Sequence, residues 1–178
     1  MVSLHTDAYT TLADWHPPTS DQRSLRQAFL SFLTARPDAC RRSCEPGHIT
    51  ASALVLDATG SEVLLTLHPR VGAWLQLGGH CEDTDETLVG AALREATEES
   101  GIAGLVIEPT PVHLGVHPIT CSLGIPTTHF DVRFVVRAPA GAEPVRSDES
   151  LDLRWWPIGA LPDDQTETNL QGMLAGVF

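Results

Sequence analysis

The sequence contains no lysine, so all of its basic side chains other than histidine are arginines. Its 11 basic residues stand against 23 acidic ones, which gives a formal net charge of -12. A chain with this balance lacks the broad basic surface with which proteins follow a nucleic-acid backbone. A small anionic substrate would need a bound cation or locally placed arginines to offset the acidic field. The charge therefore argues against extended nucleic acid as a partner and leaves small nucleotides open.

Long apolar runs and closely spaced cysteines are also missing. No stretch approaches the roughly 20 apolar residues that cross a membrane, and the N-terminus lacks the basic start and apolar run of a secretory signal. The four cysteines are too few and too scattered to predict a disulfide framework. We therefore expect a cytoplasmic protein with free thiols and no membrane partner. The sequence gives no oligomeric state, so a homodimer stays open.

A length of 178 residues suits one globular domain with some decoration. Residues 1–47 hold no strand pattern, but apolar residues at helical spacing over 20–36 predict an N-terminal helical extension packed on the core. Residues 48–178 then form the main unit. Its apolar patterns predict helices over about 84–100 and 166–177, the first capped by Asp83 or Thr84, and strands at 49–57, 62–68, 74–79, 105–119, 128–138 and 150–158. This alternation predicts an α+β fold with a mixed β-sheet between helices.

Three glutamates on the first of these helices carry the strongest chemical signal. Glu95, Glu98 and Glu99 stand at i, i+3 and i+4, so their side chains share one helix face. Glu95 and Glu99 border the apolar stripe of the helix, which aims them at the sheet-facing side and not at solvent. A plain solvated acidic face is the alternative. Because Mg²⁺ prefers oxygen ligands, this crowding of carboxylates predicts a magnesium site.

These glutamates belong to a stretch that resembles the Nudix family. The family's box runs Gly, five residues, Glu, seven residues, then Arg-Glu-aliphatic-x-Glu-Glu-x-Gly-aliphatic. Glu86, seven residues and the run from Arg94 to Ile102 match the second half. Six residues, in place of five, separate Gly79 from Glu86. We interpret the extra residue as a loop insertion, because loops absorb insertions easily; the alternative is that the acid role shifts to Asp85.

The resemblance covers roughly residues 48–162 and implies a Nudix-like α/β/α sandwich that hydrolyses phosphoanhydrides with Mg²⁺, or with Mn²⁺ as a substitute. It also implies a metal site. Glu95 and Glu99 are the expected core ligands, and Glu98 is either a further ligand or the group that holds the attacking water. The carbonyl of Gly78 or Gly79 would be a backbone ligand, since glycine lets metal and phosphate approach closely.

Two more roles follow from the resemblance. Arg94 and Glu86 are expected to orient the loop and the helix. The general base is harder to place, because family members take it from the box or from a later loop. Glu149, in the acidic loop before the last strand, is the candidate outside the box, with its neighbour Asp148 as the alternative. Each of these loop carboxylates could equally be solvated.

Candidates for substrate contact are weaker. Gly79 and the following His80 stand beside the metal site and could contact phosphate, although His80 could also be a surface histidine. Strand alternation places His129 and Asp131 on one polar face, which lines either a pocket or the solvent side of the sheet. Trp74 is the best candidate for stacking on a nucleobase, and core packing is its alternative.

The expected substrate is a nucleoside diphosphate linked to another group, either ADP-ribose-like or a nucleoside triphosphate. Pro118 resembles a feature of ADP-ribose-cleaving members and slightly favours the former.

The altered spacing motivates a second hypothesis, a Nudix-like module that binds a nucleotide without cleaving it. A third, a prenyl diphosphate isomerase, would need Cys81 as its catalytic cysteine. Cys40, Cys44 and His48 have metal-like spacing, but a structural zinc site needs four ligands and no fourth is evident.

Overall fold

A mixed eight-stranded sheet forms the centre of the computed structural model, which describes residues 3–120, 124, 126–162, 170–175 and 177. The main strand order is β3-β2-β1-β7-β5, and β4, β6 and β8 pair with β1, β7 and β2. Strands β1 and β7 are parallel, and the remaining pairs are antiparallel. The strands are β1 (His48–Leu56), β2 (Glu62–Leu67), β3 (Trp74–Leu75), β4 (Leu77–His80), β5 (Val106–Ile107), β6 (His113–Thr120), β7 (Pro126–Arg137) and β8 (Asp152–Pro157).

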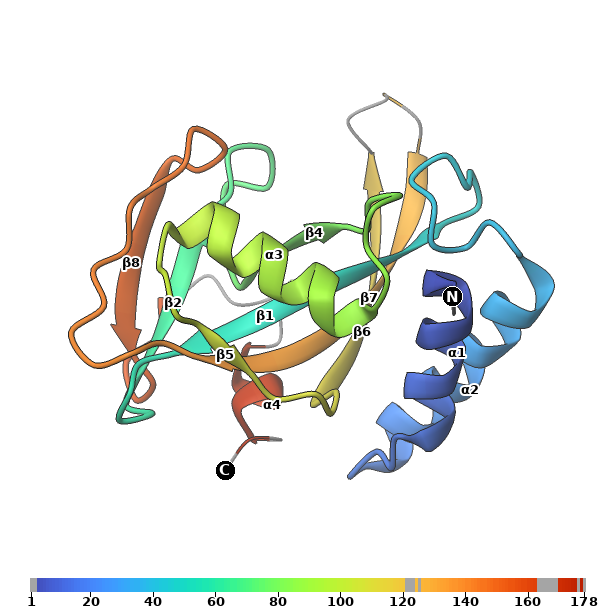
Figure 1. Ribbon diagram of the computed structural model, residues 1–178, viewed down its shortest axis with the longest axis horizontal. Coiled ribbons are helices and arrows are strands. Elements are labelled where there is room, and N and C mark those ends of the chain that lie inside the picture. Colours follow the sequence, from blue (N-terminus) through green and yellow to red (C-terminus); the bar gives the residue numbers. More distant parts are fainter. Residues whose placement is uncertain (1–2, 121–123, 125, 163–169, 176, 178) are drawn as a thin grey trace.

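Helix α3 (Leu88–Ser100) lies across one face of this sheet (Figure 1). Its apolar side chains Ala92 and Ala96 are buried against β1 and β7, which contribute Ala51, Ala53 and Val136 to the same cores. Small residues on both sides let the helix approach the sheet closely. The helix begins after the N-cap Thr87 and ends at Gly101, whose φ of 64° is left-handed.

Two further helices, α1 (Leu4–Asp14) and α2 (Ser20–Ala35), lie side by side next to the start of α3 (Figure 1). Leu12 from α1 and Phe29 and Leu33 from α2 are buried in the same core cluster as Leu88 of α3. The carboxylate of Asp7 in α1 accepts a hydrogen bond from the backbone N–H of Leu88 at 2.8 Å. Helix α1 therefore caps the N-terminus of α3 directly.

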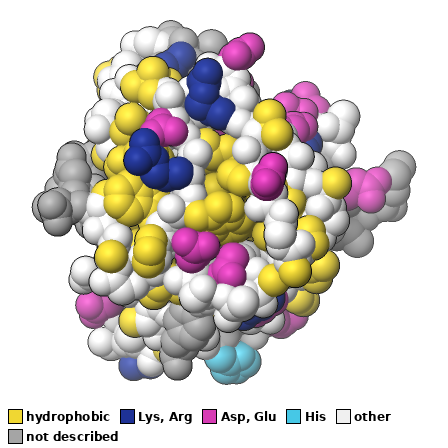
Figure 2. All heavy atoms as spheres, turned by 90° about the vertical axis from the view of Figure 1, so that its left-hand side faces the viewer, with side chains coloured by type: hydrophobic (Ala, Val, Ile, Leu, Met, Phe, Trp, Pro, Cys, Tyr) yellow, Lys and Arg dark blue, Asp and Glu magenta, His cyan; other side chains and the backbone are white. Residues whose placement is uncertain are grey.

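Helix α4 (Leu170–Ala175) covers the other face of the sheet, so the strands lie between helical layers (Figure 1). Leu170, Met173 and Leu174 pack there against the β1 and β7 residues Leu54 and Val135. The molecular face that carries β8 is mixed in character, because apolar side chains gather at its centre with arginines and acidic groups around them (Figure 2). No helix in the described ranges is long and apolar enough to cross a membrane.

The predicted α+β architecture, with a mixed sheet between helices and a helical N-terminal segment, is confirmed. Several details of the elements differ from the prediction. Helix α1 was not expected, and α3 is capped by Thr87 instead of Asp83 or Thr84. The single strand predicted over 105–119 is two strands, β5 and β6, which pair with different parts of β7. The predicted closing helix begins at Leu170 in the described part of the chain, and residues 166–169 lie outside it.

Candidate active site

Two glycines of β4 lie directly against the glutamates of α3. A side-chain carbon on Gly79 would stand 2.8 Å from both carboxylate oxygens of Glu95, so only glycine leaves that carboxylate room. Gly78 has a φ of +142°, and a side-chain carbon there would lie 2.5 Å from Ser52 on β1. The Gly78 N–H donates to Oε2 of Glu99 at 3.0 Å. The strand backbone and two carboxylates therefore meet in one place, with no side chain between them.

Burial changes the protonation of these two glutamates. Loss of solvent raises the pKa of Glu99 to about 8, and the nearby charges of Glu95, Glu149 and Glu98 add to the rise, against the Gly78 N–H. Burial also raises the pKa of Glu95, while the Arg94 guanidinium opposes the rise. The side chain of the third glutamate, Glu98, is 60% exposed. The Arg94 guanidinium offsets part of the negative charge at this site, and a divalent cation would stabilise the ionised carboxylates further.

Arg94 connects the helix to the loop that follows β4. Its Nη1 donates to Glu95 at 3.0 Å and to Glu98 at 3.1 Å. Its Nη2 donates to the backbone carbonyl of His80 at 3.1 Å and to Asp85 at 2.8 Å, and its Nε donates to Asp85 at 3.1 Å. These bonds orient Glu95 and hold β4, the glycine strand that carries Gly78 and Gly79, against α3.

Glu149 lies close enough to the site to act on it electrostatically. Burial and other groups have larger effects on the pKa of Glu95 and of Glu99. The charge of Glu149 adds to the rise of both pKa values. The loop that carries it is anchored, because the buried hydroxyls of Ser150 and Thr66 share a 2.5 Å hydrogen bond and the Leu151 N–H donates to Leu67 at 3.0 Å. Glu149 therefore stays the loop candidate for the general base, with its neighbour Asp148 as the alternative.

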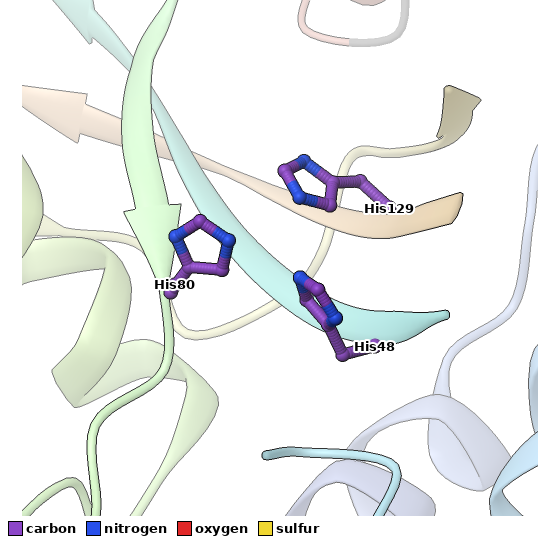
Figure 3. Close-up of side chains that lie close together, drawn as sticks. All are labelled: His48, His80 and His129. Carbon is purple, nitrogen blue, oxygen red and sulfur yellow. The ribbon is translucent and has the colours of Figure 1, made fainter. Parts of the chain in front are cut away.

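Three histidines cluster at the C-terminal end of β4, the strand that carries Gly78 and Gly79 (Figure 3). His48 begins β1, His129 is its register partner on β7, and His80 ends β4. One ring nitrogen from each lies within 4.8 Å of the others, and this is the one such group of metal-type ligands within the described ranges. Burial is the main cause that lowers the pKa of His80 to about 3 and of His129 to about 4, and it lowers that of His48 too. All three rings are therefore neutral near pH 7.

The charges around this histidine cluster act in opposite directions. Besides burial, Arg42 helps to lower the pKa of all three rings, whereas the Asp131 carboxylate raises that of His129. Arg41 and Arg42 line a surface pocket of about 560 Å³, which is also lined by Cys81, the residue after His80.

The family model described as the NUDIX domain matches residues 46–175, which is most of the chain. The chain belongs to the Nudix family. The predicted assignment to the Nudix hydrolases is thereby confirmed at the level of the family. A comparison with curated proteins finds no match.

Solved structures agree with the Nudix assignment at the level of the fold. A C. elegans Ap4A hydrolase complex has a TM-score of 0.54 at 20% identity, with 72% of this chain and 93% of that chain covered. The E. coli dihydroneopterin triphosphate pyrophosphohydrolase has a TM-score of 0.54 at 18% identity, covering 72% and 91%. The MutT protein from Methanosarcina mazei Go1 has a TM-score of 0.53 at 20% identity, covering 75% and 95%.

The structure favours the alternative interpretation of the Nudix loop. Arg94 pairs with Asp85, whose pKa is lowered mainly by this guanidinium against the opposing effect of burial. Glu86 is exposed, and no hydrogen bond or ion pair of its side chain occurs in the part of the chain that the structure describes. Five residues separate Gly79 from Asp85, as in the family's box, so the extra residue lies between Asp85 and Arg94. We therefore propose that Asp85, in place of Glu86, has the orienting role.

Asp131 was predicted to contact substrate, but its surroundings favour a structural role. It is 3% exposed, and both carboxylate oxygens are already used. One oxygen accepts from Thr50 at 2.9 Å and from Ser52 at 2.7 Å, and the other accepts from Arg133 at 2.7 Å and from Gln76 at 3.3 Å. Asp131 thus balances the buried guanidinium of Arg133, which is 1% exposed.

The remaining predicted residues are placed as follows. Trp74 packs edge to face on Trp156 with ring centroids 5.3 Å apart, and the Arg154 guanidinium lies 5.0 Å from its ring centroid, so its stacking role stays a prediction. Pro118 lies within β6 and not in a loop. Cys81 is buried and burial raises its thiol pKa, which removes the reactive thiolate that the isomerase hypothesis needs.

Proposed function

We propose that this chain is a Mg²⁺-dependent pyrophosphohydrolase that cleaves a phosphoanhydride bond in a nucleoside diphosphate linked to another group, either ADP-ribose-like or a nucleoside triphosphate. Mn²⁺ is the expected substitute metal. The observation that carries the proposal is the contact between the glycine strand and the glutamate helix, where Gly79 leaves room for Glu95 and the Gly78 N–H binds Glu99.

The donor set at this contact fits a hard divalent cation. Glu95 and Glu99 would supply carboxylate oxygens, Glu98 is an exposed third carboxylate, and the carbonyl of Gly78 or Gly79 is the proposed backbone ligand. The raised pKa of Glu99, caused mainly by burial, shows a carboxylate whose ionised form lacks a compensating charge. Bound there, Mg²⁺ would neutralise charge on the reacting phosphate oxygens and lower the pKa of a water molecule.

The chain's own residues would do the rest. In the reaction, a water oxygen forms a bond to phosphorus, the bridging P–O bond breaks, and a carboxylate takes the proton of the water. Glu149 is the proposed acceptor from the loop, with Glu98 as the acceptor from the box. Arg94 holds Glu95 and the strand in place through its bonds to Asp85 and to the His80 carbonyl. Gly79 lies against Glu95 and the His80 carbonyl accepts a hydrogen bond from Arg94, which supports our proposal that both residues contact substrate.

The named activities of the similar structures, an Ap4A hydrolase and a dihydroneopterin triphosphate pyrophosphohydrolase, belong to the proposed reaction class. Their low identity leaves the substrate of this chain open. The alternative is a module that binds a nucleotide without cleaving it, and its motivation is that the box still departs from the family's spacing by one residue, now between Asp85 and Arg94. A cytoplasmic location remains a prediction from the sequence. Whether the chain forms a homodimer stays open.

The test is a screen of nucleoside triphosphates, dinucleotides and nucleoside diphosphate sugars with the full-length protein. We expect at least one compound to release phosphate-containing products in Mg²⁺ and none to do so in a chelator. Glu99→Gln should abolish the release, whereas Glu143→Gln, which changes an exposed loop glutamate, should preserve it. Tight nucleotide binding without turnover would support the binding module instead.

A further inference from the structure

The histidine cluster of His48, His80 and His129 forms a set of ligands separate in chemistry from the glutamates. Strand β1 lies between β4 and β7, and its register places His48 opposite His129 and Thr50 opposite His80. Because alternate residues of a strand share one face, His48 lies on the face that carries Thr50, Ser52 and the buried carboxylate of Asp131. Helix α3 packs on the opposite face, against Ala51 and Ala53.

The three rings are arranged almost symmetrically. Their centroids are 5.0 Å apart for His48 and His80, 4.8 Å for His48 and His129, and 4.9 Å for His80 and His129. The rings surround one shared space (Figure 3). They come from three separate strands, so the rigid sheet fixes their spacing.

Two nitrogens in this space lack the partner that buried polar atoms normally have. His48 is 1% exposed, and its Nε2 is buried without a hydrogen bond, as is Nε2 of His129. The other nitrogen of His48, Nδ1, lies 3.5 Å from the Cys44 carbonyl oxygen. A carbonyl only accepts, so this weak contact places the proton on Nδ1 and leaves a lone pair on Nε2. Metal-binding histidines are commonly oriented by such a contact through their second nitrogen.

We propose that His48, His80 and His129 bind one Zn²⁺-type transition-metal ion, separately from the carboxylate site, with the fourth position left to an exchangeable ligand. Three imidazoles are a borderline donor set that suits Zn²⁺, Co²⁺ and related ions, whereas the glutamates suit Mg²⁺. The proposal explains why two buried nitrogens face each other without a hydrogen-bond partner. A metal there would also connect β1, β4 and β7 next to Gly79.

The geometry needs only a small adjustment. With Zn–N bonds of about 2.0 to 2.1 Å, ligand nitrogens in a tetrahedral site lie about 3.4 Å apart. The three nitrogens here lie within 4.8 Å of one another. Rotation of the imidazoles about χ2, a broad torsion for histidine, can bring them closer without movement of the strands. Since Arg42 opposes a bare cation at this place, an anion is the fourth ligand that balances the charge best.

The experiment is a Co²⁺ titration of chelator-treated, full-length protein in excess Mg²⁺, followed by the visible absorption of tetrahedral Co²⁺ and by metal analysis. We expect one Co²⁺ per chain, displaced by Zn²⁺. His129→Asn should weaken binding by more than about 100-fold, because even residues behind metal ligands change the affinity by about 10 to 100-fold. His16→Asn, which changes an exposed histidine, should bind like the unchanged protein.

Two further variants separate this proposal from the proposed function. Glu99→Gln should lose hydrolysis and keep the Co²⁺ spectrum, since its site is the other one. If circular dichroism shows that His129→Asn is poorly folded in chelator, His80→Asn takes its place. Zn²⁺ should raise the melting temperature of the unchanged protein but not that of either histidine variant. Unchanged Co²⁺ binding in the histidine variants, or its loss in Glu99→Gln, would overturn the proposal.

Discussion

The guanidinium of Arg94 donates two hydrogen bonds to Asp85, through Nη2 at 2.8 Å and through Nε at 3.1 Å. Glu86, the residue that follows Asp85, is exposed. Paired bonds of this kind fix the orientation of both groups. The same guanidinium bonds to Glu95 and to the His80 carbonyl, so Asp85 helps to hold the proposed metal site in shape.

Replacement of Asp85 should therefore damage activity more than replacement of Glu86. We expect Asp85→Ala to lower Mg²⁺ affinity or hydrolysis by about 10 to 100-fold, as is usual for residues that orient metal ligands. Glu86→Ala should stay close to the unchanged protein. Steady-state hydrolysis over a range of Mg²⁺ concentrations measures both. The reverse order of effects would restore Glu86 to the role that the spacing first gave it.

The buried Glu99 predicts a specific dependence of stability on pH. Its pKa rises from 4.5 to about 8 on folding, mainly through burial. At pH values between these two, the folded protein binds a proton that the unfolded chain releases. The contribution of Glu99 to stability is therefore full below about pH 4.5 and is lost as the pH rises to about 8.

Chemical denaturation in a chelator at several pH values tests this linkage. The metal-free protein should lose stability between pH 5.5 and 8.5, and Glu99→Gln should lose less, because glutamine has no proton to release. Mg²⁺ should flatten the slope, since it stabilises the ionised carboxylate. Equal slopes in the unchanged protein and in Glu99→Gln would show that Glu99 is ionised throughout.

Two ion pairs with the same spacing offer a matched test of burial. Asp131 and Arg133 on β7 have side chains that are 5% and 1% exposed. Asp152 and Arg154 on β8 have side chains that are 36% and 55% exposed. Asp131→Asn leaves a buried guanidinium uncompensated and should cost about 3 to 5 kcal/mol of unfolding free energy. Asp152→Asn should cost at most about 1 kcal/mol. Similar costs for the two variants would contradict a structural role for Asp131.

The cap that α1 provides to α3 makes a further prediction. The Asp7 carboxylate binds the Leu88 N–H at the positive end of the helix dipole. Asp7→Ala should lower the unfolding free energy by about 0.5 to 2 kcal/mol, the usual cost of a lost cap. Asp14→Asn, at the exposed end of α1, should change it by less than about 0.5 kcal/mol. An Asp7 variant as stable as the unchanged protein would show that α1 does not hold α3 in place.

The sequence predicted well the features that depend on residues close together in the chain. The spacing of Glu95, Glu98 and Glu99 is a property of one helix, so their shared face follows from helical geometry alone. The end of this helix near residue 100 and the break between the strands predicted at 49–57 and 62–68 are equally local. In each case the pattern and the structure depend on neighbours within a few positions.

Features that join distant segments were missed, because no local pattern records them. Asp7 caps a helix that begins 81 residues later. His48, His80 and His129 come together only through the register of three strands, and a strand pattern gives no register. The choice between Asp85 and Glu86 depended on where one extra residue lies. The sequence alone could not decide it, because the five residues from Gly79 to Asp85 and the seven from Glu86 to Arg94 each match one half of the box.

Direct measurement of Mn²⁺ binding tests the central claim, that the glutamate helix and the glycine strand hold a divalent metal. Electron paramagnetic resonance follows free Mn²⁺ as protein is added at about pH 8.5, above the raised pKa of Glu99. The unchanged protein and Glu143→Gln should bind Mn²⁺, and Mg²⁺ should displace it. Glu99→Gln should bind at least about 100-fold more weakly. Equal Mn²⁺ affinity in Glu99→Gln and in the unchanged protein would contradict the account.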